Sequence, residues 1–565
     1  MSTLVRDVKY HKITKAQLRT LLLYAEQDLY DYSRQATAFT LLKVIIGKKL
    51  TAPEIHAVME KVASLSITAD LPHVRLQARQ VFLAFLLNYP LRNKIEQHLT
   101  FYLKQLDYEH QTGRESALEM MNAIITTFPD SMLAGYAGLF FLWLGPRLVN
   151  DSAPECRKMA AACIQRLLSR LGKEVVDKLF DMVLVWVKHP KTIYRRLSVQ
   201  LCGIFIKHER KEFKRRVETL LPVVCTHLID NFDVNQPGRF VRIQMKEALE
   251  ETMDGGEVLK DHHLYQLLNM LVKLCAECPE VLTSDEFKDS LQAISAKAQE
   301  LLGHPHEWVR LGAAEFLYSM MSSTPPTDIA TLANVPVAEA ELASGFLRSN
   351  VRESLKSLIL DHVDQLRPGA QILDKLLIQT MKNLVYIAEV LKDVQEMDGE
   401  VKVSLIWLVR KLRQRINMEL ARAPLNTTIR TMVFNWFAAL ALKFSKDELR
   451  PIIFHALAPI VRELTTTETH LEELRGIAKE VSGYYKQKFG LQEYSQLVHK
   501  VQNRLDIKRA ERKKSRAQEV VKNPEKAAKR KIKKQLRTKD QKKRKIEQFK
   551  SGDRKRKIQS VEFTD

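Results

Sequence analysis

Apolar residues recur along much of this chain at the spacing of α-helices. In one example they lie at i, i+4, i+7, i+8 and i+11 on one helical face, with Leu373 a turn earlier: Leu377, Met381, Leu384, Val385 and Ala388. Alternating strand-like patterns bounded by turn dipeptides are scarce. The chain has only 19 Gly and 19 Pro, and many of the Pro stand where a helix could begin. The pattern predicts an all-α chain.

A series of arginines, each followed three residues later by a small or apolar residue, is spaced about one helical hairpin apart. The Arg series is Arg34, Arg75, Arg114, Arg157, Arg196, Arg242, Arg310, Arg352 and Arg430. Its first five intervals are 39 to 46 residues, and the step from Arg242 to Arg310 is the weakest part of the periodicity. A period of this length carried by helices indicates an array of two-helix units that stack on one another. We predict a HEAT-like α-solenoid; the alternative is an irregular helical bundle with chance periodicity.

The clearest unit spans residues 304–317. A His-Pro pair opens it, Arg310 follows, and the small residues after it would let a second helix pack closely, so we expect Ala313 to be buried. An acidic residue stands five or six positions before the Arg in two other units, at Asp70 and Asp151. Such an Asp can cap a helix start, and it can also pair with an Arg of the adjacent unit.

The array is expected over residues 1–490, with an exposed loop inserted near Ser322–Leu342, where Pro325, Pro326 and Pro336 interrupt the pattern. The longest uncharged run, Ser131–Pro146, falls short of the ~20 apolar residues of a spanning helix, so we expect a buried helix and no membrane partner. No secretory signal is visible at the start of the chain.

Candidate chemistry is sparse. The six cysteines lie in apolar helical stretches and are interpreted as buried free thiols of a reducing compartment. Cys275 and Cys278 form a single C-x-x-C without the second pair that a zinc site needs, and His262 and His263 would diverge on a helix. We find no phosphate-binding loop, dinucleotide fingerprint or nucleophile elbow. No catalytic, metal or cofactor-binding residue is predicted, and no small-molecule substrate.

Charge is concentrated in a basic tail, residues 491–565. From Arg504 onward there are 25 Lys/Arg and 9 Asp/Glu, a net charge of +16, whereas the whole chain carries +22. The tail has four basic clusters: Arg512, Lys513, Lys514 and Arg516; Lys529, Arg530, Lys531, Lys533 and Lys534; Lys542, Lys543, Arg544 and Lys545; and Arg554, Lys555, Arg556 and Lys557. Only Pro524 and Gly552 would break a helix, so much of the tail is expected to be a long, solvated helix.

Three roles for the tail remain open. Lys and Arg neutralise RNA or DNA phosphates irrespective of base sequence; short basic runs also serve nuclear or nucleolar import; and a charged tail can simply add solubility. Aromatic residues that could stack on bases are almost absent after Tyr494, where only Phe549 and Phe563 occur. RNA contact by the tail would therefore be to the backbone.

Two stretches resemble a known family. They are residues 113–121, Gly-Arg-Glu-Ser-Ala-Leu-Glu-Met-Met, continuing to Phe128-Pro129, and residues 147–151, Arg-Leu-Val-Asn-Asp, followed by 155–160. With the basic carboxyl end, they are similar to the small-subunit processome component twenty homolog family, also called the down-regulated in metastasis family. Family members are several times longer, so the chain resembles a carboxyl-terminal portion or a short isoform.

The resemblance implies a non-catalytic, nucleolar scaffold that supports processing of pre-ribosomal RNA to 18S rRNA and assembly of the small ribosomal subunit. Pre-ribosomal RNA, small nucleolar ribonucleoprotein and other small-subunit processome proteins would be its partners. The alternative is a nuclear transport receptor or adaptor of the HEAT-repeat class, although a receptor for basic cargo should present an acidic surface. A third interpretation is a phosphatase-type scaffold subunit, but it gives the basic tail no role. An enzyme is the least favoured interpretation of this sequence.

Overall fold

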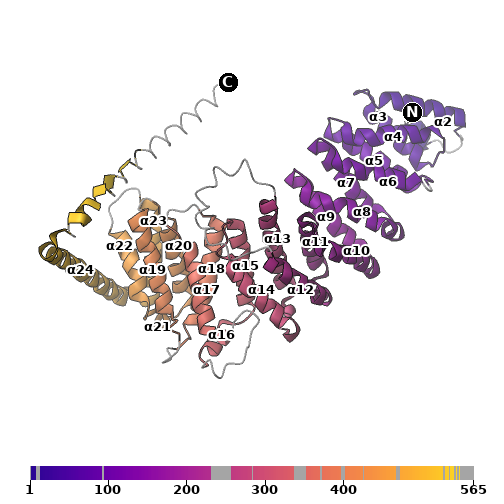
Figure 1. Cartoon of the computed structure of the whole chain (residues 1–565). Coiled ribbons are helices and arrows are strands. Elements are labelled where there is room, and N and C mark those ends of the chain that lie inside the picture. Colours follow the sequence, from indigo (N-terminus) through magenta and orange to yellow (C-terminus); the bar gives the residue numbers. More distant parts are fainter. Residues whose placement is uncertain are drawn as a thin grey trace. The chain divides into compact units, whose positions relative to one another are not determined.

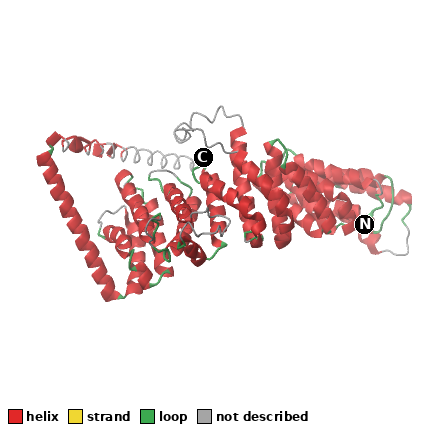
Figure 2. Cartoon of the chain, turned by 60° about the horizontal axis from the view of Figure 1, so that its bottom comes forward, coloured by secondary structure: helices red, strands yellow, loops and turns green. Residues whose placement is uncertain are grey.

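The computed structural model describes most of the chain. The described residues are 2–7, 13–91, 94–230, 256–282, 284–335, 351–368, 372–395, 401–423, 426–465, 471–525 and, further along the tail, 528–533, 535–536, 538–539, 542–543 and 546. Their secondary structure is helical throughout, without a strand (Figure 2). The predicted all-α, solenoid-type fold is confirmed.

The chain divides into two compact units, which we describe separately: residues 1–365 with 371–402, and residues 366–370 with 403–565. Unit 1 contains α1 (Ser2–Asp7), α2 (Lys15–Asp28), α3 (Gln35–Gly47), α4 (Glu54–Thr68), α5 (Pro72–Asn88), α6 (Ile95–Lys104), α7 (Gln111–Thr127), α8 (Asp130–Asn150), α9 (Pro154–Arg170), α10 (Lys173–Val187), α11 (Thr192–Glu209), α12 (Lys214–Asp230), α13 (Gly256–Glu277), α14 (Lys288–Leu301), α15 (Glu307–Ser322), α16 (Pro326–Ala333), α17 (Val351–Gln365) and α18 (Asp374–Leu391). It also has short 3₁₀ turns, among them η3 (Arg210–Phe213) and η6 (Asp285–Phe287). Unit 2 contains α19 (Leu405–Arg422), α20 (Thr428–Lys443), α21 (Lys446–Leu449), α22 (Ile453–Leu464), α23 (Glu472–Phe489) and α24 (Leu491–Lys522).

Unit 1 is built from helical hairpins whose second helices form a continuous layer. Consecutive helices pair, as in α4 with α5, α8 with α9 and α10 with α11. The second helices then pack on one another in chain order, α3, α5, α7, α9, α11, α13 and α15, and α15 packs on α18 (Figure 1). Each hairpin thus buries its apolar face against its neighbours, as a stacked repeat requires.

Four members of the Arg series lie in the first turn of second helices, those of α5, α7, α9 and α15. The guanidinium of Arg75 donates to the carbonyls of Ala69 and Asp70 (2.7 and 2.9 Å), which precede it by six and five residues. The same pair of bonds, from an Arg that is the fourth residue of its helix, recurs at Arg114, Arg157 and Arg310. These arginines therefore hold the turn that precedes each second helix. Arg242 lies outside the described residues.

The expected pairing of an Asp with an Arg of the adjacent unit occurs at one of the two predicted positions. Asp151 accepts from the Ala153 backbone N–H (2.9 Å) and forms a two-point ion pair with Arg114 of the preceding hairpin (3.0 Å for both contacts). Asp70 instead offers its backbone carbonyl to Arg75, and the carboxylates near Arg34 are those of Asp28 and Asp31. Of the two predicted positions, only the one between α7 and α9 therefore has the pairing.

Small residues allow the second helices to approach closely, as predicted for residues 304–317. Ala313 is fully buried. A Cβ added at Gly312 would lie 3.0 Å from the Cβ of Leu268 on α13, so a larger residue there would push α15 away from α13. In the face predicted at residues 373–388, Leu377, Leu384 and Ala388 are buried, while Val385 is half-buried.

Two predicted segments differ from expectation. The segment expected to be an exposed loop is helical over Pro326–Ala333, where α16 buries Ile329 and Ala333, because a Pro at the helix start is compatible with helix. Residues 336–342 lie outside the described residues. Helix α8 covers the uncharged run and packs on α9, α10 and α11, but it is long and apolar enough to span a membrane by length and composition, and only 39 % of its apolar window is buried.

Unit 2 is centred on a buried ion cluster. Arg430, at the start of α20, contacts Glu419 of α19 (3.1 Å) and Glu463 of α22 (3.3 Å), and the side chains of Arg430 and Glu419 are fully buried. Glu419 also accepts from the backbone N–H groups of Ile429 and Arg430, which caps α20. Burial raises the pKa of Glu419, against the opposing effect of these hydrogen bonds and of the Arg430 charge.

Candidate nucleic-acid interface

The basic tail begins as part of unit 2. Helix α24 starts after Gly490, whose positive φ of 78° is a conformation that favours glycine, and packs on α22 and α23. Tyr494 and Val501 are buried, and the Tyr494 hydroxyl hydrogen-bonds to Ser482 (2.5 Å). Glu493 pairs with Arg450 (3.1 Å), which fixes the first turn. The first part of the tail, where the sequence predicted a separate segment, is therefore an integral helix of the folded unit.

Beyond Leu505, the described side chains of α24 are solvent-exposed, and the far end of this long helix stands apart from the other helices of unit 2 (Figure 2). The first predicted cluster lies on this part of α24, and its four cations are exposed: Arg512, Lys513, Lys514 and Arg516. The helix is interrupted at Asn523, next to the predicted breaker Pro524. The expectation of a long, solvated helix is confirmed over this part of the tail.

The remaining clusters are only partly described. Lys529, Arg530, Lys531 and Lys533 are helical and exposed, and so are Lys542 and Lys543. The other predicted cations fall outside the described residues: Lys534, Arg544, Lys545, Arg554, Lys555, Arg556 and Lys557. The described tail cations form a succession of exposed helical positions, and no convergent pocket joins them.

The structure adds basic residues that sequence reasoning missed. Arg410 and Arg413 of α19, His455 of α22, and Arg504 and Lys508 of α24 gather on one surface, which we call the three-helix basic cluster. Arg410 Nε lies 3.3 Å from His455 Nε2, and an Arg413 Nη1 lies 3.3 Å from His455 Nδ1. Arg504 and Lys508 sit immediately before the first tail cluster, so the exposed cations of α24 continue from this surface into the tail.

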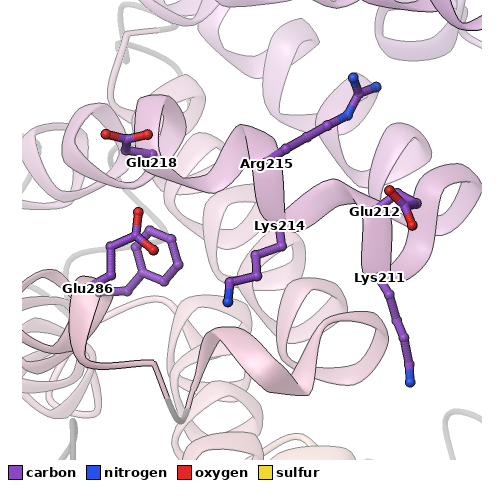
Figure 3. A pocket seen from close by; sticks show the side chains of 7 residues that line it. Lys211, Glu212, Lys214, Arg215, Glu218 and Glu286 are labelled. Atoms are coloured by element: carbon purple, nitrogen blue, oxygen red, sulfur yellow. The ribbon is translucent and has the colours of Figure 1, made fainter.

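A surface hollow in unit 1 offers a contrasting arrangement. It lies where η3 and the start of α12 face η6, and its lining, shown in Figure 3, has three cations and three anions: Lys211, Glu212, Lys214, Arg215, Glu218 and Glu286, with Phe287. Arg215 is already paired with Asp177 (2.7 Å) and Glu209 (3.0 Å). Balanced charge and existing ion pairs make this hollow a poor site for a polyanion.

The cysteine and histidine motifs of the sequence serve the core. The Cys278 thiol donates to the Arg210 carbonyl (2.8 Å), and burial raises the pKa of the Cys275 thiol to about 12. Five of the six cysteines are buried free thiols as predicted, whereas Cys225 is half-buried. His262 accepts from Arg196 (3.1 Å), while burial lowers the pKa of His263 to about 3. Among the described residues no group of three or more His, Cys, Asp or Glu is placed to hold a metal ion.

Comparison with known families gives one match that spans most of the chain. Residues 194–548 match the family described as small subunit processome component 20 homolog, C-terminal. The match covers the later helices of unit 1, all of the helices of unit 2 and the first three basic clusters of the tail.

Two curated relatives carry the same name. The U3 small nucleolar RNA-associated protein 20 of Schizosaccharomyces pombe is 24 % identical over 523 residues, which are 92 % of this chain and 20 % of that protein. Its counterpart in Saccharomyces cerevisiae is 23 % identical over 542 residues, 93 % of this chain and 20 % of that protein. The chain thus spans about a fifth of the length of these relatives.

Among solved structures, Kap121p is 12 % identical with a TM-score of 0.36, covering 86 % of this chain and 54 % of that one. Importin beta is 12 % identical with a TM-score of 0.28, covering 86 % of this chain and 66 % of that one.

Proposed function

Because the chain belongs to the small subunit processome component 20 homolog family, as its carboxyl-terminal region, we propose that it is a non-catalytic scaffold of the nucleolar small-subunit processome. In this proposal it supports processing of pre-ribosomal RNA to 18S rRNA and assembly of the small ribosomal subunit. The family match over residues 194–548 is the observation that carries the proposal. The names of the two curated relatives, which associate those proteins with U3 small nucleolar RNA, support small nucleolar ribonucleoprotein as a partner.

The fold supports a holding role. A stack of helical hairpins offers an extended surface on which each unit contacts only its neighbours. Charged groups inside it serve the packing: Arg75, Arg114, Arg157 and Arg310 hold turns, and Arg430 with its two glutamates lies buried in unit 2. The burial and the hydrogen bonds of these charged side chains are thus accounted for by their role in holding the helices together.

The basic tail supplies the RNA contact in this proposal. Its described cations are exposed and helical, and the segment from Arg504 carries a net charge of +16. Such a segment binds phosphates by releasing counterions, largely irrespective of base sequence. If it contacts six to ten phosphates, raising salt from about 50 to 200 mM should lower affinity on the order of 10³–10⁵ on a duplex-like scale.

Two measurements test the proposal. Crosslinking of the protein to RNA in cells, followed by sequencing, should recover pre-ribosomal RNA; a scatter of unrelated messages would contradict the scaffold role. In solution, the full chain and a chain lacking residues 523–565 should be titrated with salt on two unrelated RNAs. The truncation keeps α24 whole, so equal binding by both forms would move RNA contact off the distal tail.

A further inference from the structure

Three helices of unit 2 bring cations together around one aromatic pair. The guanidinium carbon of Arg504 lies 4.3 Å from the Phe454 ring centroid, and that of Arg413 lies 5.8 Å from the same centroid. The neighbouring His455 ring is approached by Arg410 at one nitrogen and by Arg413 at the other, both at 3.3 Å. A neutral imidazole accepts at only one nitrogen, so the ring cannot satisfy both guanidinium groups.

The cations of this surface have no paired carboxylate among the residues that the structure describes. In the described structure Arg410, Arg413, Arg504 and Lys508 form no ion pair, whereas the nearby Arg509 is paired with Asp506 (3.0 Å). Burial and the charges of Arg413, Arg410, Arg504 and Lys508 together lower the pKa of His455 to about 4. The pKa of Arg413 is likewise lowered, by burial and by the charges of Arg462, Arg504 and Arg512. Both groups are therefore surrounded by positive charge.

Gathering like charges without counter-charges opposes folding, and a bound anion would relieve that repulsion. We propose that the three-helix basic cluster, formed by Arg410, Arg413, His455, Arg504 and Lys508, is a phosphate-backbone binding site for RNA on folded unit 2. This inference rests on the proposed RNA-binding scaffold and adds a fixed site to the contacts of the tail. Arg410, Arg504 and Lys508 are exposed and reach the ligand, while half-buried Arg413 and His455 hold them in place.

The arrangement favours RNA over an acidic protein segment. Arg504, Lys508 and Arg512 lie at i, i+4 and i+8 on α24, and four residues of helix advance about 6 Å, close to the separation of successive phosphates on one strand. Guanidinium groups bind phosphates through paired N–H donors. The same stripe continues into the first tail cluster, so one strand could pass from the fixed site onto the tail.

The test compares two variants of the full chain with equal loss of charge. Variant one is Arg410→Gln, Arg504→Gln, Lys508→Gln; the control is Lys479→Gln, Lys486→Gln, Lys488→Gln in α23, outside the cluster. Binding to fluorescent oligouridylate is followed by anisotropy across salt concentrations. Loss of three contacts should reduce the salt slope by about 2 and the affinity on the order of a hundredfold at about 0.1 M salt, using ~0.7 ions released per single-strand phosphate. The control should lose a few-fold at most.

Circular dichroism and thermal unfolding check the fold of both variants. Variant one should unfold at the same temperature as the unsubstituted chain or higher, because like-charge repulsion has been removed. Equal affinity losses in variant one and control, with the unsubstituted chain still binding RNA, would overturn the fixed site and leave the tail as the RNA contact. Failure of the unsubstituted chain to bind RNA would instead overturn the proposed function.

Polyglutamate serves as a competitor of matched charge. If the cluster binds RNA, polyglutamate should displace oligouridylate only weakly. Variant one and the control should then bind polyglutamate equally well. Suppose instead that polyglutamate displaces oligouridylate from the unsubstituted chain at the same concentration of charge as competing RNA, and that variant one no longer binds polyglutamate. That result would overturn the assignment in favour of an acidic protein partner.

Discussion

The ion pair between Arg114 and Asp151 predicts that equivalent arginines of the Arg series differ in importance. Arg75 and Arg114 occupy the same position in α5 and α7, are both about nine-tenths buried, and both donate to two turn carbonyls. Only Arg114 also pairs with a carboxylate, that of Asp151, whose side chain is 1 % exposed. Arg→Met at each position keeps much of the apolar stem and removes the donors.

The expected costs follow from what each substitution leaves behind. Arg75→Met exposes two turn carbonyls that water can reach in part, which should cost about 1–2 kcal/mol. Arg114→Met does the same and also leaves the Asp151 carboxylate buried, held only by the Ala153 N–H, so the total should be about 3–5 kcal/mol. The two substitutions should therefore differ by about 2–3 kcal/mol.

Amide hydrogen exchange with mass spectrometry is the suitable assay, because a long repeat array need not unfold in one step. Protection should fall in α7 and α9 for Arg114→Met, and by much less in α5 for Arg75→Met. Adding Asp151→Asn to Arg114→Met removes the unpaired charge and should restore at least half of the lost protection. Equal losses at the two positions, or no recovery in the double variant, would refute the role assigned to Asp151.

Three further predictions concern the interior. Arg430→Met should destabilise unit 2 by about 3–5 kcal/mol, because Glu419 and Glu463 would remain buried without their guanidinium; unchanged chemical denaturation would contradict this. Stability should fall as pH drops from about 6.5 to about 4, since burial lowers the pKa of His362 to about 4 and that of His263 to about 3, and the unfolded chain then binds protons that the folded chain does not. Thermal unfolding should show this acid limb, and His263→Leu should flatten it. Ala313→Asp should lower stability by several kcal/mol through burial of a charge, while Ala36→Asp, on the exposed face of α3, should change the unfolding midpoint little.

Periodicity in the sequence was sufficient to predict the fold. Repeated apolar spacing indicated helices, and four arginines of the series marked second helices, because each of these side chains holds the turn that precedes its helix. Prolines gave a weaker signal: Pro325 and Pro326 indicated a loop, yet Pro326 opens α16, since proline is compatible with both. The basic tail was visible as composition, but the packing of its first turns on α22 and α23 was not, because that depends on tertiary contacts of Tyr494 and Val501.

The three-helix basic cluster could not be predicted from the sequence, for a physical reason. Arg410 and His455 are 45 residues apart, and each stands on a helix whose charged residues would pass for an ordinary solvated face. What distinguishes the cluster is that, among the described residues, no carboxylate pairs with its cations, which depends on how α19, α22 and α24 are oriented. A tail can attract RNA by charge count alone, but a fixed phosphate site needs cations held in place before the ligand arrives. Unit 2 holds these cations on folded helices, and substitutions of Arg410, Arg504 and Lys508 leave the buried Arg430 ion cluster intact, so RNA affinity can be lowered there without a loss of fold stability.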